Sequence, residues 1–254
     1  MKTIFTTNLK QALRSPGFLL GVLVIPLFLF LSQLDTLVKL FQSEDPQTYG
    51  NFLQFILDGL KGNTMSFLMP ILCALPYAAS FVEDVRCGVI KSILPRTTRR
   101  GYLWGKAAAC AVSGGLVLAA GIVLSGGLSW LVLSPLEKAA EEGMSLQPQI
   151  LELLQKILLF FFSGAFWSVF GAWTATFTGS RYVAYTAPFI FYYLLIILYE
   201  RYFPYVVLFY PLVWLNPGNG WFAGILGVIL WVGELLAIGM VLFVLSAERR
   251  LERV

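Results

Sequence analysis

The sequence of 254 residues contains no histidine and only three cysteines. Without histidine, the chain lacks the commonest metal ligand and the usual general base near neutral pH, and a Ser-His or Cys-His catalytic pair is excluded. Cys73, Cys87 and Cys110 are widely spaced and form no C-x-x-C motif, so they predict neither a disulfide framework nor a zinc site. A Ser-Lys nucleophile stays open, but no pattern points to one, and an enzyme is the weakest functional class.

Charged residues are also scarce, at 13% of the chain, whereas 58% of the residues are hydrophobic and the mean hydropathy is +0.76. This composition is too apolar for a soluble globular domain of this length. The small excess of 18 Lys and Arg over 14 Asp and Glu fits basic cytosolic loops and does not indicate a nucleic-acid surface. The sequence therefore predicts an integral membrane protein.

Six apolar runs have roughly the length of about 20 residues that crosses a hydrocarbon core of about 30 Å. We expect membrane spans near residues 17–32, 64–82, 105–133, 153–177, 182–199 and 221–245. Residues 1–15 place apolar side chains on one helical face and basic ones away from it, which predicts a helix lying in the membrane interface. No connection is long enough for a second domain, so residues 1–254 are expected to form one all-α, polytopic membrane domain.

The basic residues of the connections predict the orientation. The N-terminal segment, residues 83–104 with the adjoining Lys106, the link at Arg181 and the tail after Ala247 hold 13 of them, and the other three connections hold 5. Because Lys and Arg concentrate on the cytosolic side, we expect both termini in the cytosol and a multi-pass protein of the cell membrane.

Residues 201–220, between the fifth and sixth predicted spans, are rich in aromatic side chains and contain Pro204 and Pro211. Proline interrupts a helix, so this segment is not expected to cross the membrane as a straight helix. We predict a re-entrant segment that is shielded from lipid by protein.

The most charged part of the chain is residues 83–104, between the second and third predicted spans. Glu83 and Asp84 suit a helix N-terminus, an apolar stripe runs from Val85 to Leu94, and Pro95 is expected to end the helix. A helix tied to two spans can act as a lever. The alternative is a basic loop that only fixes the topology.

This segment resembles the cytosolic coupling segment of type-2 ATP-binding-cassette (ABC) exporter permeases. The resemblance is carried, after an amphipathic N-terminal helix and a first span, by Glu83, Gly88, Lys91, Leu94-Pro95, Thr98-Arg99, Tyr102 and Gly105-Lys106. The six-span plan and the broken excursion between spans five and six also resemble that family, so the similarity extends over nearly the whole chain. The run Arg99-Arg100-Gly101 departs from the pattern by being more basic and more flexible, which leaves the end of the coupling helix open.

The resemblance implies that this segment docks into a cleft of a separate ATPase subunit, which binds ATP and Mg, and that two permease subunits, identical or homologous, enclose the export path. The residues expected to couple to the ATPase are Glu83, Asp84, Arg86, Gly88, Lys91, Leu94, Arg96, Arg99 and Arg100. No G-x-x-x-x-G-K-[ST] motif occurs, so this chain is expected to hydrolyse no ATP and to bind no cofactor itself.

Two further features bear on function. Glu234 lies near the middle of the sixth predicted span, where an ionisable group is costly; a structural hydrogen bond, a place in the substrate path and proton coupling all stay open. Small residues recur at four-residue spacing, which predicts close helix packing or a subunit interface. Among these are Gly115, Gly121, Gly224 and Gly233.

We therefore expect a permease subunit that exports an amphipathic peptide, drug or lipid. One alternative is an ion- or proton-coupled carrier that uses Glu234 as its titrating group. Another is a non-transporting membrane protein, such as an immunity or assembly factor. No metal ligands are predicted.

Overall fold

The computed structural model describes residues 2–42, 48–93, 95, 97–137, 145–218, 221 and 223–252. The predicted coupling residues Leu94 and Arg96 lie outside these ranges. Within them the chain is helical and contains no β-strand, which confirms the predicted all-α class. The α-helices are α1 (Lys2–Leu13), α2 (Pro16–Ser32), α3 (Leu34–Gln42), α4 (Asn51–Lys61), α5 (Asn63–Leu72), α6 (Ser80–Arg86), α7 (Ile90–Ile93), α8 (Arg99–Leu133), α9 (Gln147–Thr178), α10 (Arg181–Arg201), α11 (Pro211–Leu215) and α12 (Gly224–Leu251).

Four of these helices, α8, α9, α10 and α12, are long and apolar enough to cross a membrane. A fifth candidate is the pair formed by α1 and α2, which is bent by 51°. The bend has a local cause, because the Ser15 side chain accepts a hydrogen bond from the Phe18 amide at 3.1 Å and Pro16 opens α2, a combination that starts a new helix. The chain thus has the predicted multi-pass character, with four or five helices that could span the bilayer.

The predicted second span, residues 64–82, is broken in the structure. Helix α5 ends at Leu72, residues 73–79 form turns, and α6 begins at Ser80. Pro70 lies inside α5 and Pro76 lies in the turns. Each proline lacks the backbone N–H that a helix interior uses, and two of them six residues apart account for a break in place of one straight helix.

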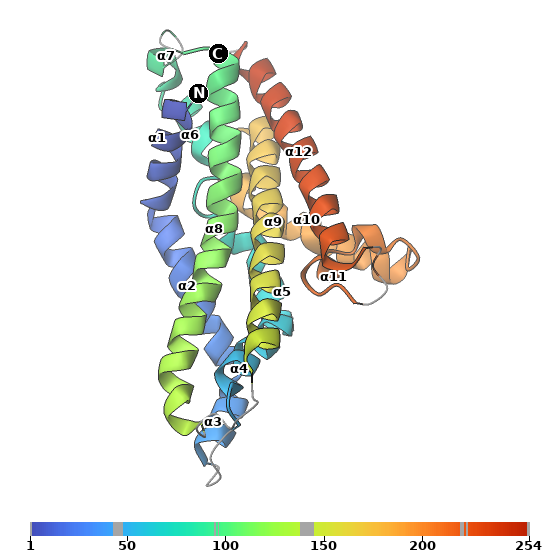
Figure 1. The fold of residues 1–254 in the computed structure, drawn as a ribbon. Coiled ribbons are helices and arrows are strands. Elements are labelled where there is room, and N and C mark those ends of the chain that lie inside the picture. Colours follow the sequence, from blue (N-terminus) through green and yellow to red (C-terminus); the bar gives the residue numbers. More distant parts are fainter. Residues whose placement is uncertain are drawn as a thin grey trace.

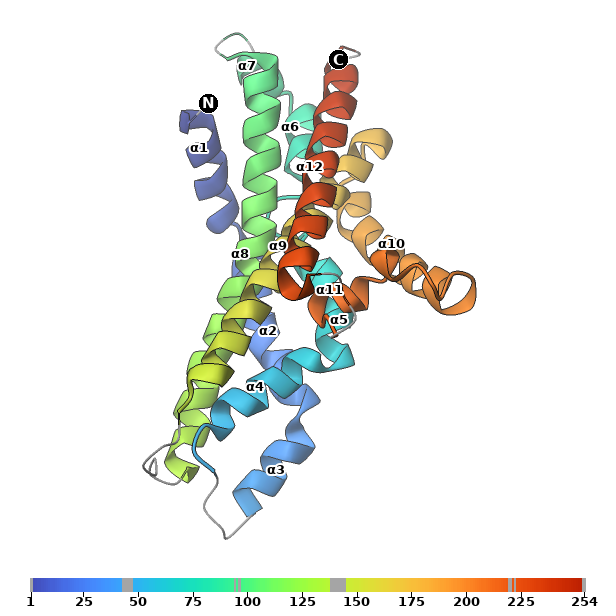
Figure 2. The same cartoon turned by 45° about the vertical axis from the view of Figure 1, so that its right-hand side comes forward.

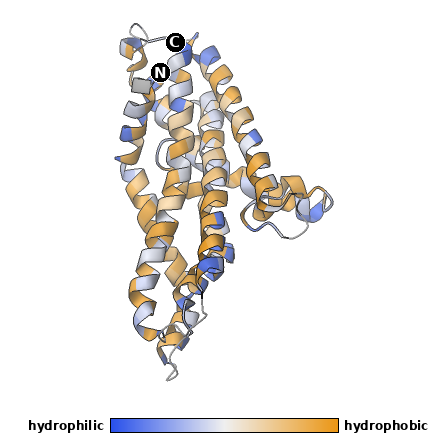
Figure 3. Cartoon of the chain, in the orientation of Figure 1, coloured by the Kyte–Doolittle hydropathy of each residue, from blue (hydrophilic) through white to orange (hydrophobic). Residues whose placement is uncertain are grey.

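Helices α8 and α9 run side by side through the middle of the molecule (Figure 1), with α1 and α2 packed against α8 and with α10 and α12 packed against α9. Both termini lie at one end, together with α6 and α7, whereas α3 lies at the opposite end (Figures 1 and 2). We call these the termini end and the far end. Apolar residues cover most of the length of the helices, and hydrophilic residues gather at the termini end and near α4 and the start of α9 (Figure 3).

Glycines allow the close approach of α8 to its neighbours. A Cβ atom on Gly115 would lie 2.7 Å from the backbone oxygen of Phe161 in α9, and one on Gly121 would lie 2.4 Å from Cδ1 of Ile25 in α2. Gly224 and Gly233 differ, since a Cβ on either would meet no atom of the described chain within 4 Å. The predicted packing positions therefore divide into two that touch neighbouring helices and two that face outward from α12.

The segment between α10 and α12 contains only a short 3-10 turn (Val207–Phe209) and the five-residue helix α11 among its described residues. The indole nitrogens of Trp214 and Trp231 both donate to the Leu208 carbonyl, at 2.9 and 3.1 Å. This irregular stretch, which lies halfway along the molecule beside α12 (Figure 2), is consequently held by side chains that satisfy a backbone acceptor left free by the lack of a regular helix.

Candidate functional site

The charged segment consists of two short helices instead of the single one expected. Gly88 separates α6 from α7 with a φ of +69°, a left-handed conformation that glycine adopts without steric cost. Helix α8 begins at Arg99, and its first turn is capped by the Thr98 hydroxyl, which accepts from the Gly101 amide at 3.3 Å. Arg99 and Arg100 therefore belong to α8, four residues beyond the end that Pro95 was expected to impose.

The predicted coupling residues that the structure describes fall into two groups. Six are exposed and lie on α6, α7, the turn between them or the first turn of α8: Glu83, Arg86, Gly88, Lys91, Arg99 and Arg100. Asp84 is different, because its side chain turns inward and is only 20% exposed. The six exposed residues thus form a predominantly basic surface at the termini end, which we call the basic end surface. The partly buried carboxylate of Asp84 lies beneath it.

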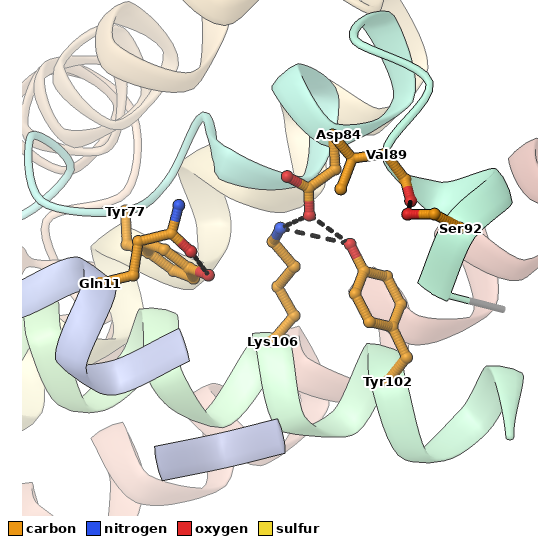
Figure 4. Close-up of polar contacts among 7 residues, drawn as sticks. All are labelled: Gln11, Tyr77, Asp84, Val89, Ser92, Tyr102 and Lys106. Atoms are coloured by element: carbon orange, nitrogen blue, oxygen red, sulfur yellow. Dashed lines mark hydrogen bonds and ion pairs between the residues drawn. The ribbon is translucent and has the colours of Figure 1, made fainter. Parts of the chain in front are cut away.

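Asp84 is the centre of a buried polar cluster that joins α6 to α8 (Figure 4). One of its carboxylate oxygens accepts hydrogen bonds from the Lys106 ammonium and from the Tyr102 hydroxyl. The Lys106 nitrogen also lies 3.3 Å from the Tyr102 hydroxyl. Tyr102 and Lys106 are one helical turn apart on α8, so both reach the same face of that helix.

Lys106 is almost fully enclosed, with 2% of its side chain exposed. A buried ammonium is costly unless it is paired and hydrogen-bonded, and Asp84 supplies that partner. The rings of Tyr77 and Tyr102 add a second favourable contact, because the Lys106 nitrogen lies 5.4 Å from each ring centroid, within the range of cation–π attraction. The pair therefore holds α6 against α8 at a fixed point.

The cluster extends to the N-terminal helix. The Tyr77 hydroxyl, in the turns before α6, donates to the Gln11 side-chain oxygen of α1 at 3.3 Å (Figure 4). Helices α1, α6 and α8 are thereby connected through one set of polar side chains. The sequence analysis counted Lys106 with the basic loop and gave Gln11 and Tyr77 no role. The signal that could have identified Lys106 is its position inside an apolar run, where an ionisable side chain needs a partner.

Helix α12 is joined to the same end. The Arg100 side chain forms an ion pair with Glu248 at 3.1 Å, although Arg100 is 82% exposed, so the pair contributes little stability. Farther along α12, the Arg250 guanidinium donates to the Thr176 carbonyl at the end of α9. The first turn of α8 and the last turns of α9 and α12 are thus linked beside the basic end surface.

Glu234 lies apart from this surface. It is exposed on α12 and lines a cavity of about 440 Å³ together with Trp221 and Trp231. Among the described residues it has no ion-pair partner. Its carboxyl group therefore faces outward from the single chain, into a place where a membrane would put lipid, water or another protein.

The part of the chain that the structure describes contains no group of three or more Cys, Asp or Glu that could hold a metal ion. No protein-family model matches the chain, and no curated protein matches it.

Proposed function

We propose that this chain is the membrane-spanning permease subunit of an ATP-driven ABC exporter, with six crossings and both termini in the cytosol. The resemblance of residues 83–106 supports this, as does the presence of that segment at the end where both termini lie. The observation that carries the proposal is the buried contact of Asp84 with Lys106, because it joins an exposed charged segment directly to the longest helix of the molecule.

The proposed mechanism is mechanical transmission. A separate cytosolic ATPase, which itself binds ATP and Mg, contacts the basic end surface. When its subunits close, they push on α6 and α7, and the Asp84 cluster transfers the displacement to α8. Since α8 packs along α9 and α2, a tilt of α8 changes access to a path between two permease subunits. The cargo class that we propose is an amphipathic peptide, drug or lipid.

The test is a double charge reversal on the basic end surface. The measurement uses the purified complex of the tagged chain with its co-purifying ATPase. We expect the double variant Glu83→Lys with Arg99→Glu to abolish the transport-linked stimulation of ATP hydrolysis by that ATPase and to leave membrane insertion intact. Both residues are exposed, so folding should not suffer. The matched control is Arg201→Glu, which reverses the charge of an exposed residue at the end of α10 and outside the basic end surface. This variant should retain the stimulation of ATP hydrolysis.

Normal ATPase stimulation by the double variant would remove the coupling role. Transport by the purified chain in vesicles, without any second protein, would remove the exporter assignment altogether.

The outward position of Glu234 favours one second candidate, an ion- or proton-coupled carrier. A carboxyl group in mid-membrane that lines a cavity of about 440 Å³ is placed as proton-relay groups are. The two functions differ in their energy source. A carrier loses transport when the proton gradient collapses and when Glu234 is replaced by Gln, whereas an exporter loses it when ATP is depleted.

A further inference from the structure

A second buried cation lies in the half of the molecule away from the Asp84 cluster. It belongs to a cavity of about 680 Å³ between the end of α4, the first turns of α9 and the segment that follows α11. We call this the Lys156 cavity. Its described lining consists of Lys61, Pro148, Leu151, Glu152, Gln155, Lys156, Leu159, Asn216, Pro217 and Ile225.

Lys156 is 7% exposed, and its ammonium donates to the Leu215 carbonyl at 2.9 Å and to the Asn216 side-chain oxygen. Both acceptors are uncharged. An ammonium has three N–H donors, so two neutral partners leave it one further donor. No carboxylate of the described chain lies within 4.0 Å of it, in contrast to the Lys106 ammonium.

The remaining charges of the cavity do not neutralise Lys156. Glu152 forms an ion pair with Lys61 at 3.0 Å, and both side chains are nearly half exposed. The lining therefore carries two ammonium groups and one carboxylate. A buried cation without a carboxylate favours an anion brought from outside.

The depth of Lys156 fits a particular anion. Thr178, at the termini end of α9, is 22 residues away, or about 33 Å at the helical rise of 1.5 Å per residue. This length is close to the thickness of a hydrocarbon core, about 30 Å. When the termini end of α9 lies at the cytosolic surface, Lys156 lies at the level of the phosphate groups of the outer leaflet.

Apolar surface continues from the cavity toward the termini end, along α9 and α12. Leu159 and Ile225 line the cavity itself, and the exposed side chains on the next turns in that direction are Leu158 of α9 and Leu226 and Leu230 of α12. A small polar anion would gain nothing from these side chains, whereas the acyl chains of a lipid would bury against them.

We propose that the Lys156 cavity binds a phosphate group, supplied by the headgroup of a phospholipid of the outer leaflet. Lys156 donates to the phosphate, Lys61 adds a second positive charge at the rim, and the apolar side chains of α9 and α12 on the termini side of the cavity hold the first part of the acyl chains. This site is separate from the basic end surface and does not depend on the chain being an exporter.

The test measures lipid retention by native mass spectrometry of the full-length chain purified in detergent. Three probes are added separately: phosphatidylglycerol, diacylglycerol and inorganic phosphate. We expect the wild type to bind phosphatidylglycerol at least about tenfold more tightly than Asn216→Asp, which places a carboxylate of equal size beside Lys156 and preserves the shape of the site. Lys156→Met should also bind phosphatidylglycerol more weakly than the wild type. Lys39→Met removes an exposed lysine of α3 at the far end and should bind phosphatidylglycerol as tightly as the wild type.

Lys156→Met leaves two acceptors unpaired and is open to misfolding, so Asn216→Asp is the decisive variant. Equal phosphatidylglycerol binding by wild type and Asn216→Asp overturns the site. Diacylglycerol binding as tight as that of phosphatidylglycerol shows that no phosphate is recognised, which also overturns it. Occupation by inorganic phosphate without lipid retention makes free phosphate the ligand and overturns the lipid source.

Discussion

At the scale of single residues, the two buried lysines behave differently because of their partners. Lys106 has a carboxylate from another helix and two aromatic rings, whereas Lys156 has only neutral acceptors. A buried ion pair is weak evidence for stability, since desolvation offsets much of its attraction. The consequence of the Asp84–Lys106 pair is geometric: α6 has one favoured position on α8, because any other position leaves a buried charge unpaired.

This view predicts a specific pattern in a double-mutant cycle. Asp84→Asn or Lys106→Met alone should lower the free energy of unfolding by about 3 kcal/mol, because each leaves one partner buried without its counter-charge. The double variant should lose clearly less than the sum of the two. Thermal unfolding of the purified chain, followed by tryptophan fluorescence, measures all four proteins. Additive losses would show that the two side chains do not interact.

At the scale of elements, the close contacts of α8 and the open face of α12 predict opposite outcomes for the same substitution. Gly115→Ala forces a Cβ to within 2.7 Å of a backbone oxygen, so we expect a loss of about 1 to 3 kcal/mol. Gly233→Ala meets nothing within 4 Å in the described chain, and in a helix interior alanine should be up to about 1 kcal/mol more favourable than glycine.

The unfolding temperatures of Gly115→Ala and Gly233→Ala, measured in the same detergent, check these two predictions. A loss of stability for Gly233→Ala would mean that α12 packs against a second protein even after purification. No loss for Gly115→Ala would contradict the close approach of α8 and α9.

The elements differ in how well the sequence predicts them. Helices α8, α9, α10 and α12 follow from long apolar runs, since lipid requires continuous helices there. Helices α8 and α9 begin six residues before the apolar runs that predicted them, and α12 ends six residues after its run. The break at residues 73–79 was not predicted, because proline in a membrane helix is compatible with either a bend or an interruption. The split of the charged segment at Gly88 was missed for a similar reason, as glycine permits a left-handed φ without requiring it.

The polar clusters were harder to predict than the helices. Asp84 and Lys106 are 22 residues apart, and Lys156 and Asn216 are 60 apart. Helical periodicity states which face each side chain takes on its own helix, but it does not state how two helices are rotated against each other. The sequence therefore predicted the charged segment and left unknown which of its residues turn inward.

At the scale of the whole molecule, the arrangement of charge predicts which end faces the cytosol. The termini end carries α6, α7, both chain ends and the start of α8 (Figures 1 and 2). Helix α8 begins with Arg99 and Arg100, and positive residues favour the cytosolic side. The proposed ATPase contact and the proposed phosphate site both depend on this orientation, because they lie at opposite surfaces of the bilayer.

Native cysteine reports the orientation directly. Cys87, next to Gly88, is exposed, whereas Cys73 and Cys110 are buried. A membrane-impermeant maleimide should therefore leave Cys87 unlabelled in intact cells and label it in inverted vesicles. Cys87→Ser combined with Thr48→Cys moves the single exposed thiol to a residue near the start of α4 that is exposed, and this variant should give the reverse result. Labelling in detergent, where both thiols react, controls for reactivity. Labelling of Cys87 in intact cells would place the basic end surface outside, where no cytosolic ATPase can reach it.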